Sequence, residues 1–238
     1  MATLAVNPTA DGYTVKTLAY SGRFGATFAA VVTSATATSV NTTGGYLYLQ
    51  ADKSARSAEW SVGRPVLYFD LSSMPSGASI SAATLTFYVH HYDVNDLSGN
   101  RLKIYLWDES TAIDTTDYDA FDTNYTTTIH TGITGTGANQ VINIDSTLLS
   151  WLQANPQGDG SNNFPIILRN IYDFDYASLS DPSALNTMVF RSNDYTTSSD
   201  RPVLTITYTT GYTQKVLGVA GNKVLGIAAA NIDKVNEV

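Results

Sequence analysis

The chain of 238 residues contains no cysteine, few charged side chains and no long apolar run. Without cysteine, the protein has no disulfide, no thiolate metal site and no cysteine nucleophile. Charged residues make up 14% of the chain, and its net charge is −8. Binding to phosphates needs clustered Lys and Arg, so we expect no nucleic-acid partner. No run approaches the roughly 18 apolar residues of a transmembrane helix, so we expect no membrane insertion.

The N-terminal stretch, residues 1–8, has neither the basic region nor the long apolar core of a secretory signal. We therefore expect either that a signal has been removed or that the protein leaves the cell by another route, such as lysis. Thr, Ser, Asn, Gly and Tyr are abundant. This composition is typical of an extracellular β protein or a virion protein, whose surface is solvated by hydroxyls and amides.

The clearest structural pattern lies in residues 63–92. Residues 66–69 are apolar at every position, which is typical of a strand buried on both faces. Between Ala83 and Val89, apolar residues alternate with polar or amphipathic ones, which is typical of a strand with one buried face. A loop of Ser, Pro and Gly joins the two runs, so we expect a hairpin-like unit.

Short apolar or alternating runs predict further strands over the first 210 residues. They lie at residues 13–18, 46–49, 101–107, 141–144, 164–169, 187–192 and 202–208, with one or two more in residues 25–40. Loops are expected at residues 51–61, 108–139 and 170–186. Residues 145–155 predict one helix, capped by Asp145 or Ser146 and ended by Pro156. The expected fold class is all-β: a β-sandwich of jelly-roll type with one short helix and a C-terminal extension.

Residues 211–238 differ from the β-sandwich domain predicted for residues 1–210. The tetrapeptide Lys-Val-Leu-Gly occurs at residues 215–218 and again at 223–226, with a Gly221-Asn222 dipeptide suited to a hairpin turn between the copies. About 28 residues cannot form a core of their own. We expect this segment to dock on a neighbouring subunit, or on its own domain, or to be disordered. The apolar residues predicted to mediate assembly are Val216, Leu217, Val224, Leu225, Ile227, Ile232 and Val235.

No pattern in the sequence indicates an enzyme. The nucleophile elbow, the zinc-protease helix and the phosphate-binding loop are all missing. His90 and His91 are adjacent on a predicted strand, so their side chains should point to opposite faces. Glycosidase chemistry needs two carboxylates that face each other across a cleft, and nothing in the sequence selects a pair. We therefore expect a non-enzymatic protein.

Acidic loops suggest calcium as the one cofactor. Calcium prefers several carboxylate oxygens on a flexible loop. The alternative is a solvated loop in which Asp residues form turns. The candidate calcium ligands are Asp114, Asp117, Asp119 and Asp122 in one loop, with Asp173 and Asp175 in a second.

Tyrosines beside Asp or Asn suggest contact with sugars. A flat ring can stack on sugar C–H groups while neighbouring polar groups bind the hydroxyls. The alternative is that these rings cover contacts between loops and core, or an oligomer interface. The candidates are Tyr118, Tyr125, Tyr172, Tyr176 and Tyr195.

The first 210 residues resemble the DNRLRE-domain family of β-sandwich modules, which are related to carbohydrate-binding modules. The matching pieces are residues 10–13, 63–71, 80–85, 142–144 with Trp151-Leu152, 190–194 and 201–208. In the family, an acidic segment with Trp follows the middle strand, and residues 114–122 replace it here. The resemblance implies the sandwich fold and a habit of ligand binding, from which this loop departs.

The C-terminal segment is similar to extensions found on virion proteins of tailed phages. The similarity rests on Lys-Val-Leu-Gly and on residues 231–238, Asn-Ile-Asp-Lys-Val-Asn-Glu-Val. The sequence therefore predicts a virion structural protein, as a capsid decoration or a tail or fibre component, that forms homo-oligomers and binds host glycans weakly. The alternatives are a secreted carbohydrate-binding module and a subunit of an extracellular filament.

Overall fold

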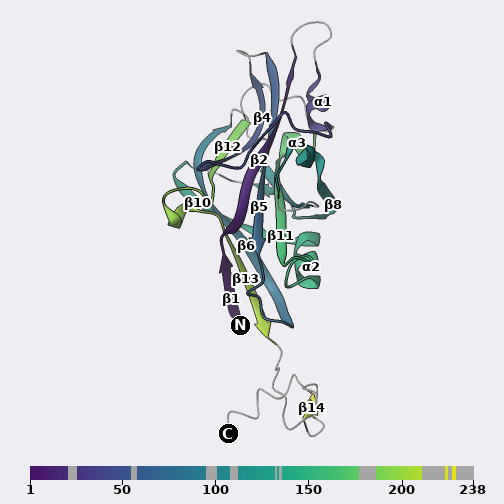
Figure 1. The fold of residues 1–238 in the computed structure, drawn as a ribbon, viewed down its shortest axis with the longest axis vertical. Helices are drawn as coiled ribbons and strands as arrows, with labels where there is room; N and C mark the ends of the chain where they lie inside the picture. The colour runs from purple at the N-terminus through teal and green to yellow at the C-terminus, as the bar shows by residue number, and fades with distance from the viewer. Residues whose placement is uncertain are drawn as a thin grey trace.

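The computed structural model describes residues 1–20, 26–54, 58–94, 101–107, 112–131, 133, 136–176, 186–210, 223–224 and 227–228. Strands account for 56% and helices for 15% of it. One large antiparallel sheet dominates and few helices accompany it, so the predicted all-β, sandwich-like fold is confirmed (Figure 1). Among the described residues, no helix is long and apolar enough to cross a membrane.

Of the strands in the described part of the chain, thirteen form the large sheet, which we call the β body, and two more form a small separate sheet. The β body consists of β1 (Ala2–Val6), β2 (Pro8–Ala19), β3 (Ser39–Asn41), β4 (Tyr46–Ser54), β5 (Glu59–Asp70), β6 (Ala78–Val94), β7 (Arg101–Trp107), β8 (Phe121–Thr126), β9 (His130–Thr131), β10 (Ala138–Ile144), β11 (Asn163–Asn170), β12 (Asn186–Arg191) and β13 (Val203–Thr210). The small sheet pairs β14 (Lys223–Val224) with β15 (Ile227–Ala228).

The β body has two halves that face each other, one built around the long strand β6 and the other around the long strand β5. In one half, β6 pairs with β10 along one side and with β13 along the other, and β1 extends that half beyond β13. In the other half, β5 pairs with β2 along one side and with β4 and then β11 along the other. β12 pairs with both β6 and β4 and so joins the halves. The main core lies between them, with side chains from β6, β10 and β13 meeting those from β5, β7 and β11.

The predicted burial of the two central strands is confirmed. Residues 62–69 of β5 are all buried, and in β6 the alternation from Ala83 to Val89 places the apolar side chains in the core. Their predicted hairpin-like pairing is wrong, because β12 and β4 lie between β6 and β5 in the sheet. Leu71 and Met74 of the connecting loop are buried. The loop therefore crosses the end of the core and carries the chain from one half to the other.

The described residues contain three α-helices where one was expected: α1 (Phe28–Val32), α2 (Ser146–Ala154) and α3 (Ile171–Phe174). The prediction of a strand in the first part of residues 25–40 is wrong, because α1 lies there. Thr27 caps it, and Phe28, Val31 and Val32 share one face that packs near Trp60. The helix α3 begins the segment predicted as a loop at residues 170–186. Two short 3-10 helices, η2 (Thr115–Asp119) and η3 (Ser198–Asp200), complete the described helices.

The predicted helix at residues 145–155 is confirmed as α2, but its cap differs. Asp145 occupies the N-cap position without bonding the helix, because its carboxylate accepts hydrogen bonds from the backbone and the hydroxyl of Thr128. The helix packs against β6, β7 and β8. Residues 51–61, predicted as a loop, instead contain the end of β4 and the start of β5.

Three charged side chains form a buried ion cluster next to the half of the sheet that is built around β5. Arg64 of β5 and Arg169 of β11 both bind the carboxylate of Asp173 in α3, with nitrogen–oxygen distances of 2.6–3.0 Å. Arg64 and Asp173 are fully buried, and Arg169 is 7% exposed. Arg64 also donates to the carbonyl oxygens of Val32 and Tyr118. One guanidinium therefore connects β5 to α1, α3 and η2.

Aromatic rings and opposite charges offset the free-energy cost of burying this cluster. The guanidinium carbon of Arg64 lies 3.8 Å from the ring centre of Tyr118, and that of Arg169 lies 4.1 Å from Phe121. Burial alone would raise the pKa of Asp173, but the charges and hydrogen bonds of Arg169 and Arg64 outweigh it and lower the pKa to about 2. Asp173 therefore stays ionised at neutral pH.

We expect Asp173→Asn to lower the free energy of unfolding by about 3–5 kcal/mol, because it leaves two buried guanidinium groups without their counter-charge. Urea unfolding at pH 7 measures this change in the free energy of unfolding. Since the folded pKa lies below the unfolded value, the contribution of Asp173 is present above about pH 4 and is lost as the pH falls towards 2.

Asp175→Asn is the matched control for this substitution, because Asp175 is half-buried and lies outside the cluster. It should change stability by less than about 1 kcal/mol. Equal effects of the two variants would show that the buried cluster does not stabilise the fold.

Candidate functional site

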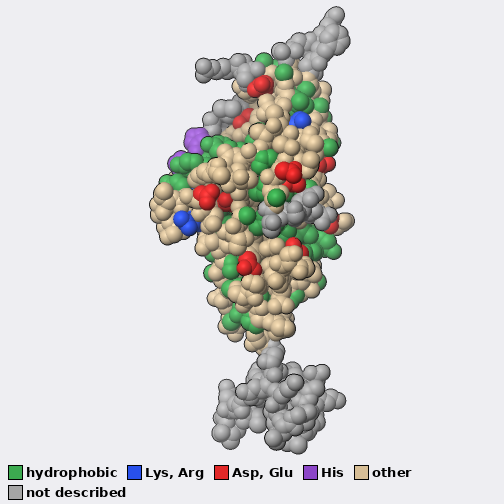
Figure 2. All heavy atoms as spheres, in the orientation of Figure 1, with side chains coloured by type: hydrophobic (Ala, Val, Ile, Leu, Met, Phe, Trp, Pro, Cys, Tyr) green, Lys and Arg blue, Asp and Glu red, His purple; other side chains and the backbone are tan. Residues whose placement is uncertain are grey.

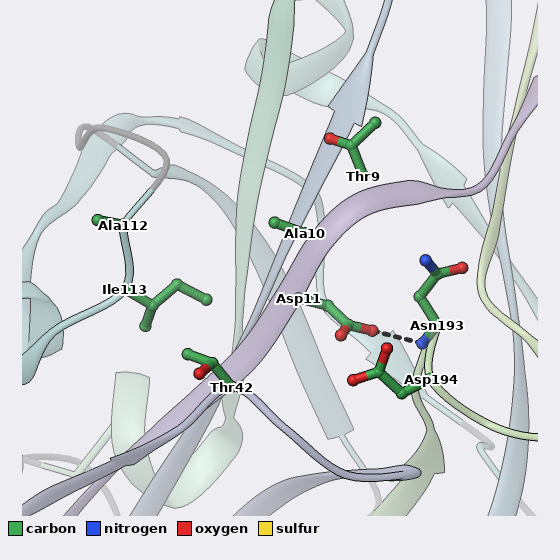
Figure 3. Close-up of a pocket in the computed structure, with 8 residues that line it drawn as sticks. All are labelled: Thr9, Ala10, Asp11, Thr42, Ala112, Ile113, Asn193 and Asp194. Atoms are coloured by element: carbon green, nitrogen blue, oxygen red, sulfur yellow. Dashed lines mark hydrogen bonds between the residues drawn. The ribbon is translucent and has the colours of Figure 1, made fainter.

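A pocket of about 450 Å³ opens on the β body beside the start of β2. Four separate segments line it: β2, the residue after β3, the stretch before η2, and the turn after β12. The lining residues are Thr9, Ala10, Asp11, Thr42, Ala112, Ile113, Asn193 and Asp194 (Figure 3). None of these residues was among the predicted site residues.

Asp11 is the most buried polar group of the pocket. It is only 7% exposed, and its carboxylate accepts a hydrogen bond of 2.6 Å from the backbone N–H of Asn193. The next residue, Gly12, allows β2 to approach β3 closely, because a Cβ there would lie 2.6 Å from the carbonyl oxygen of Asn41. A side chain at position 12 would therefore displace the wall that carries Thr42.

The turn that carries Asn193 and Asp194 is held by Ser192. The Ser192 hydroxyl donates to the carbonyl oxygen of Gly44 and accepts from the backbone N–H of Asp194. The Asp194 side chain is exposed, and Figure 3 shows its carboxylate pointing towards that of Asp11. Burial raises the pKa of Asp11 to about 6, the Asn193 hydrogen bond opposes this rise, and the charge of Asp194 adds to it.

The pocket offers hydrogen-bonding groups of several kinds around a small apolar wall. Two carboxylates, an amide and two threonine hydroxyls line the pocket together with Ala10 and Ile113. Such a lining suits a polyhydroxylated ligand, because each sugar hydroxyl both donates and accepts. Asp11 can supply either a donor or an acceptor near pH 6, since both of its protonation states are populated there.

Two of the five tyrosines predicted to bind sugar are buried, so that prediction is wrong for them. Tyr118 is 0% exposed and covers Arg64, and Tyr172 is 3% exposed in the core beside α1. Tyr125, Tyr176 and Tyr195 are half-buried and pack on different parts of the β body. These three do not form one stacking surface.

The four aspartates predicted to bind calcium instead shape the chain around η2. Asp114 accepts from the backbone N–H of Thr116, and Asp117, which is buried, accepts from the backbone N–H of Asp114. Asp122 accepts from the backbone N–H of Asn124, and Asp119 lies 3.8 Å from Arg64. These bonds match the alternative of turn-forming aspartates. Among the described residues, no three His, Asp or Glu side chains group so that they could hold a metal ion.

The residues predicted to mediate assembly lie almost wholly outside the described part of the chain. Val216, Leu217, Leu225, Ile232 and Val235 are outside it, as is the predicted turn at Gly221-Asn222. The backbones of Val224 and Ile227 are described and pair with each other in the small sheet.

The pocket residues could have been found only in part from the sequence. The Asp11-Gly12 and Asn193-Asp194 pairs are recognisable as turn-prone polar dipeptides, but they are 182 positions apart. Only the assembly of the strands into the sheet brings them together.

We expect the stability of the protein to depend on the ionisation of Asp11. Because its folded pKa is about 6 and the ordinary value is 3.8, its favourable contribution is present below about pH 4 and is lost as the pH rises through 6. Asp11→Asn removes this titration and keeps an acceptor for Asn193. The variant should gain up to about 3 kcal/mol over the parent protein between pH 4 and pH 7.5.

Urea unfolding across this pH range measures the difference. As a control, Asp194→Asn removes the neighbouring charge and should shift the midpoint of the transition to lower pH. If the stability of Asp11→Asn and of the parent changed with pH in the same way, the raised pKa of Asp11 would be contradicted.

Comparisons with known proteins do not extend this picture. No protein-family model matches the chain, and a search of curated proteins gave no significant match. The resemblances to DNRLRE domains and to phage virion proteins therefore stay predictions, and the case for function depends on the chain's own residues.

Proposed function

We propose that this protein is a non-enzymatic structural subunit, built into a larger assembly through residues 211–238. The assembly that the sequence favours is a phage virion, with the β body as a capsid decoration or a tail or fibre component. A secreted carbohydrate-binding module and a filament subunit are the alternatives.

The observation that carries this proposal is the separation of the small sheet from the β body. The buried side chains of the main core lie between Leu47 and Ile206. The strands β14 and β15 pair only with each other among the described strands. A two-residue strand pair is not stable alone in water, so these residues need a further surface to pack on.

Charge and surface also favour a role in assembly over catalysis. The C-terminal segment carries three lysines and two acidic residues, so it contributes +1 to the net charge of −8 and residues 1–210 contribute −9. The face of the β body in Figure 2 accordingly shows more Asp and Glu than Lys and Arg. A weakly basic segment is attracted to the acidic surface of another copy.

The pocket around Asp11 supports glycan binding as a second role. Its carboxylates and amide resemble in kind the groups that bind sugar hydroxyls, and it lies on the rigid β body rather than on one loop. Glycan binding would serve either a virion that adsorbs to a host surface or a secreted binding module.

We expect deletion of residues 211–238 to abolish self-association and leave the β body folded. The buried side chains of the main core come from residues 47–206, so the circular dichroism spectrum and the unfolding midpoint of the truncated chain should match those of the full chain. Light scattering after gel filtration should show an oligomer for the full chain and a monomer for the truncated one.

A full-length chain that is a monomer at all accessible concentrations would contradict the proposal. The virion assignment adds a second requirement: the full chain, and not the truncated one, must be incorporated into purified phage particles. An oligomer that never enters a particle would favour the filament.

For the second role, we expect a glycan array to detect ligands of the full chain, and Asp194→Ala to weaken their binding about tenfold or more. One hydrogen bond to a charged group is worth roughly 1.5–3 kcal/mol. Asp194 is exposed, so the fold should be unaffected. Thr196→Ala, on the same exposed stretch, is the control.

Arrays run with calcium and with a chelator test whether binding needs the predicted cation. Unchanged binding by Asp194→Ala would remove the pocket as the glycan site.

A further inference from the structure

The strand β1 forms one edge of the β body. It pairs with β13 over five consecutive residues, from Ala2 opposite Tyr208 to Val6 opposite Leu204. Among the described strands, β13 is its only partner. The backbone groups on the other side of β1 are therefore available to a further strand.

This edge lacks the features by which proteins usually block strand addition. Residues 2–6 are Ala-Thr-Leu-Ala-Val, with no charge and no proline, and their pairing with β13 has no bulge. Leu4 and Val6 pack partly on the main core, while Thr3 and Ala5 are exposed. A strand added here would extend an apolar layer on one face and a solvated layer on the other.

The C-terminal segment leaves the β body beside this edge. β13 ends at Thr210, and its residue Tyr208 lies opposite Ala2, so the N-terminus and the exit of the segment are neighbours (Figure 1). Lys215-Val216-Leu217-Gly218-Val219 is the first apolar run after β13. The second copy of its motif begins with β14, which already pairs with β15.

We propose that the free edge of β1 receives residues 215–219 of a second copy of this chain as an added strand. This inference rests on the proposed role of the segment in assembly and names its partner surface. Two copies related by a twofold axis can exchange their segments reciprocally, since each segment leaves next to a β1 edge.

A second copy suits this edge better than the chain's own segment. To run antiparallel to its own β1, the segment would first have to reach the Val6 end. Thr210 lies six residues beyond Leu204, the partner of Val6, so that path is about 20 Å along the strand and about 10 Å across two strand spacings, or roughly 22 Å in all. The five steps from Thr210 to Lys215 span at most about 17 Å. The connection is therefore too short for the chain's own segment, whereas a second copy has no such limit.

Disulfide trapping tests the proposal in the full chain, which has no native cysteine. One variant carries Thr3→Cys on the exposed face of β1. A differently tagged set carries a single cysteine at each position from 214 to 219. The two are unfolded in urea, mixed, refolded together and oxidised, so a tagged heterodimer can form only between copies.

We expect heterodimer yield to alternate along residues 214–219, with a ratio of about fivefold or more between neighbours. Successive side chains of a strand point to opposite faces, and a disulfide needs Cβ atoms within about 4.5 Å. Thr123→Cys is the matched control acceptor, because Thr123 is exposed on β8 at the far end of the sheet order. With this control acceptor, the heterodimer yield should be low and should not alternate along residues 214–219.

Three results would overturn the inference. The first is a yield for Thr3→Cys no higher than that for Thr123→Cys. The second is a profile without alternation. The third is intrachain bonding in a Thr3→Cys, Val216→Cys double variant at high dilution. If any of these occurs while deletion of residues 211–238 still abolishes the oligomer, the assembly role stands and only the β1 surface is wrong.

Discussion

The bond between Arg64 and Asp173 is the constraint on which the second half of the sheet depends. Arg64 is fully buried, so each of its nitrogen donors needs a partner inside the protein, and these partners come from α1, η2 and α3. Arg169 shares the same carboxylate. A site with two cations and one anion is stabilised further by the rings of Tyr118 and Phe121. The position of η2 is thus decided by electrostatics as much as by packing.

The candidate pocket depends on this arrangement. Its wall at Ala112 and Ile113 leads directly into η2, whose residue Tyr118 binds Arg64 through both its carbonyl oxygen and its ring. The opposite wall is held by Ser192 and by the bond from Asn193 to Asp11. The β body is therefore a rigid frame that presents a polar pocket on one side and an open strand edge at one end. The two proposed binding features of the chain lie at these two places.

Residue type alone does not identify a binding site where burial decides the role of a side chain. Tyrosines and aspartates of residues 114–122 and 172–176 look like ligand-binding groups in the sequence. In the structure Tyr118 and Tyr172 are core residues, and Asp173 is buried between two arginines. The residues that do form a pocket, such as Asp11 and Asn193, carry no local signal that would connect them. Contacts across more than 180 positions depend on how the strands assemble into the sheet and leave no periodic pattern in the sequence.

The sequence by itself determined those features that a single strand or helix expresses locally. Alternation in β6, continuous apolarity in β5, and the stripe of α2 each follow from the side-chain period of one element, so the all-β class was predictable. Only the tertiary structure decided that β5 and β6 lie apart, that residues 28–32 form a helix against Trp60, and that Arg64 is buried. The physical reason is that burial and pairing depend on distant partners, whereas periodicity depends on neighbours in the chain.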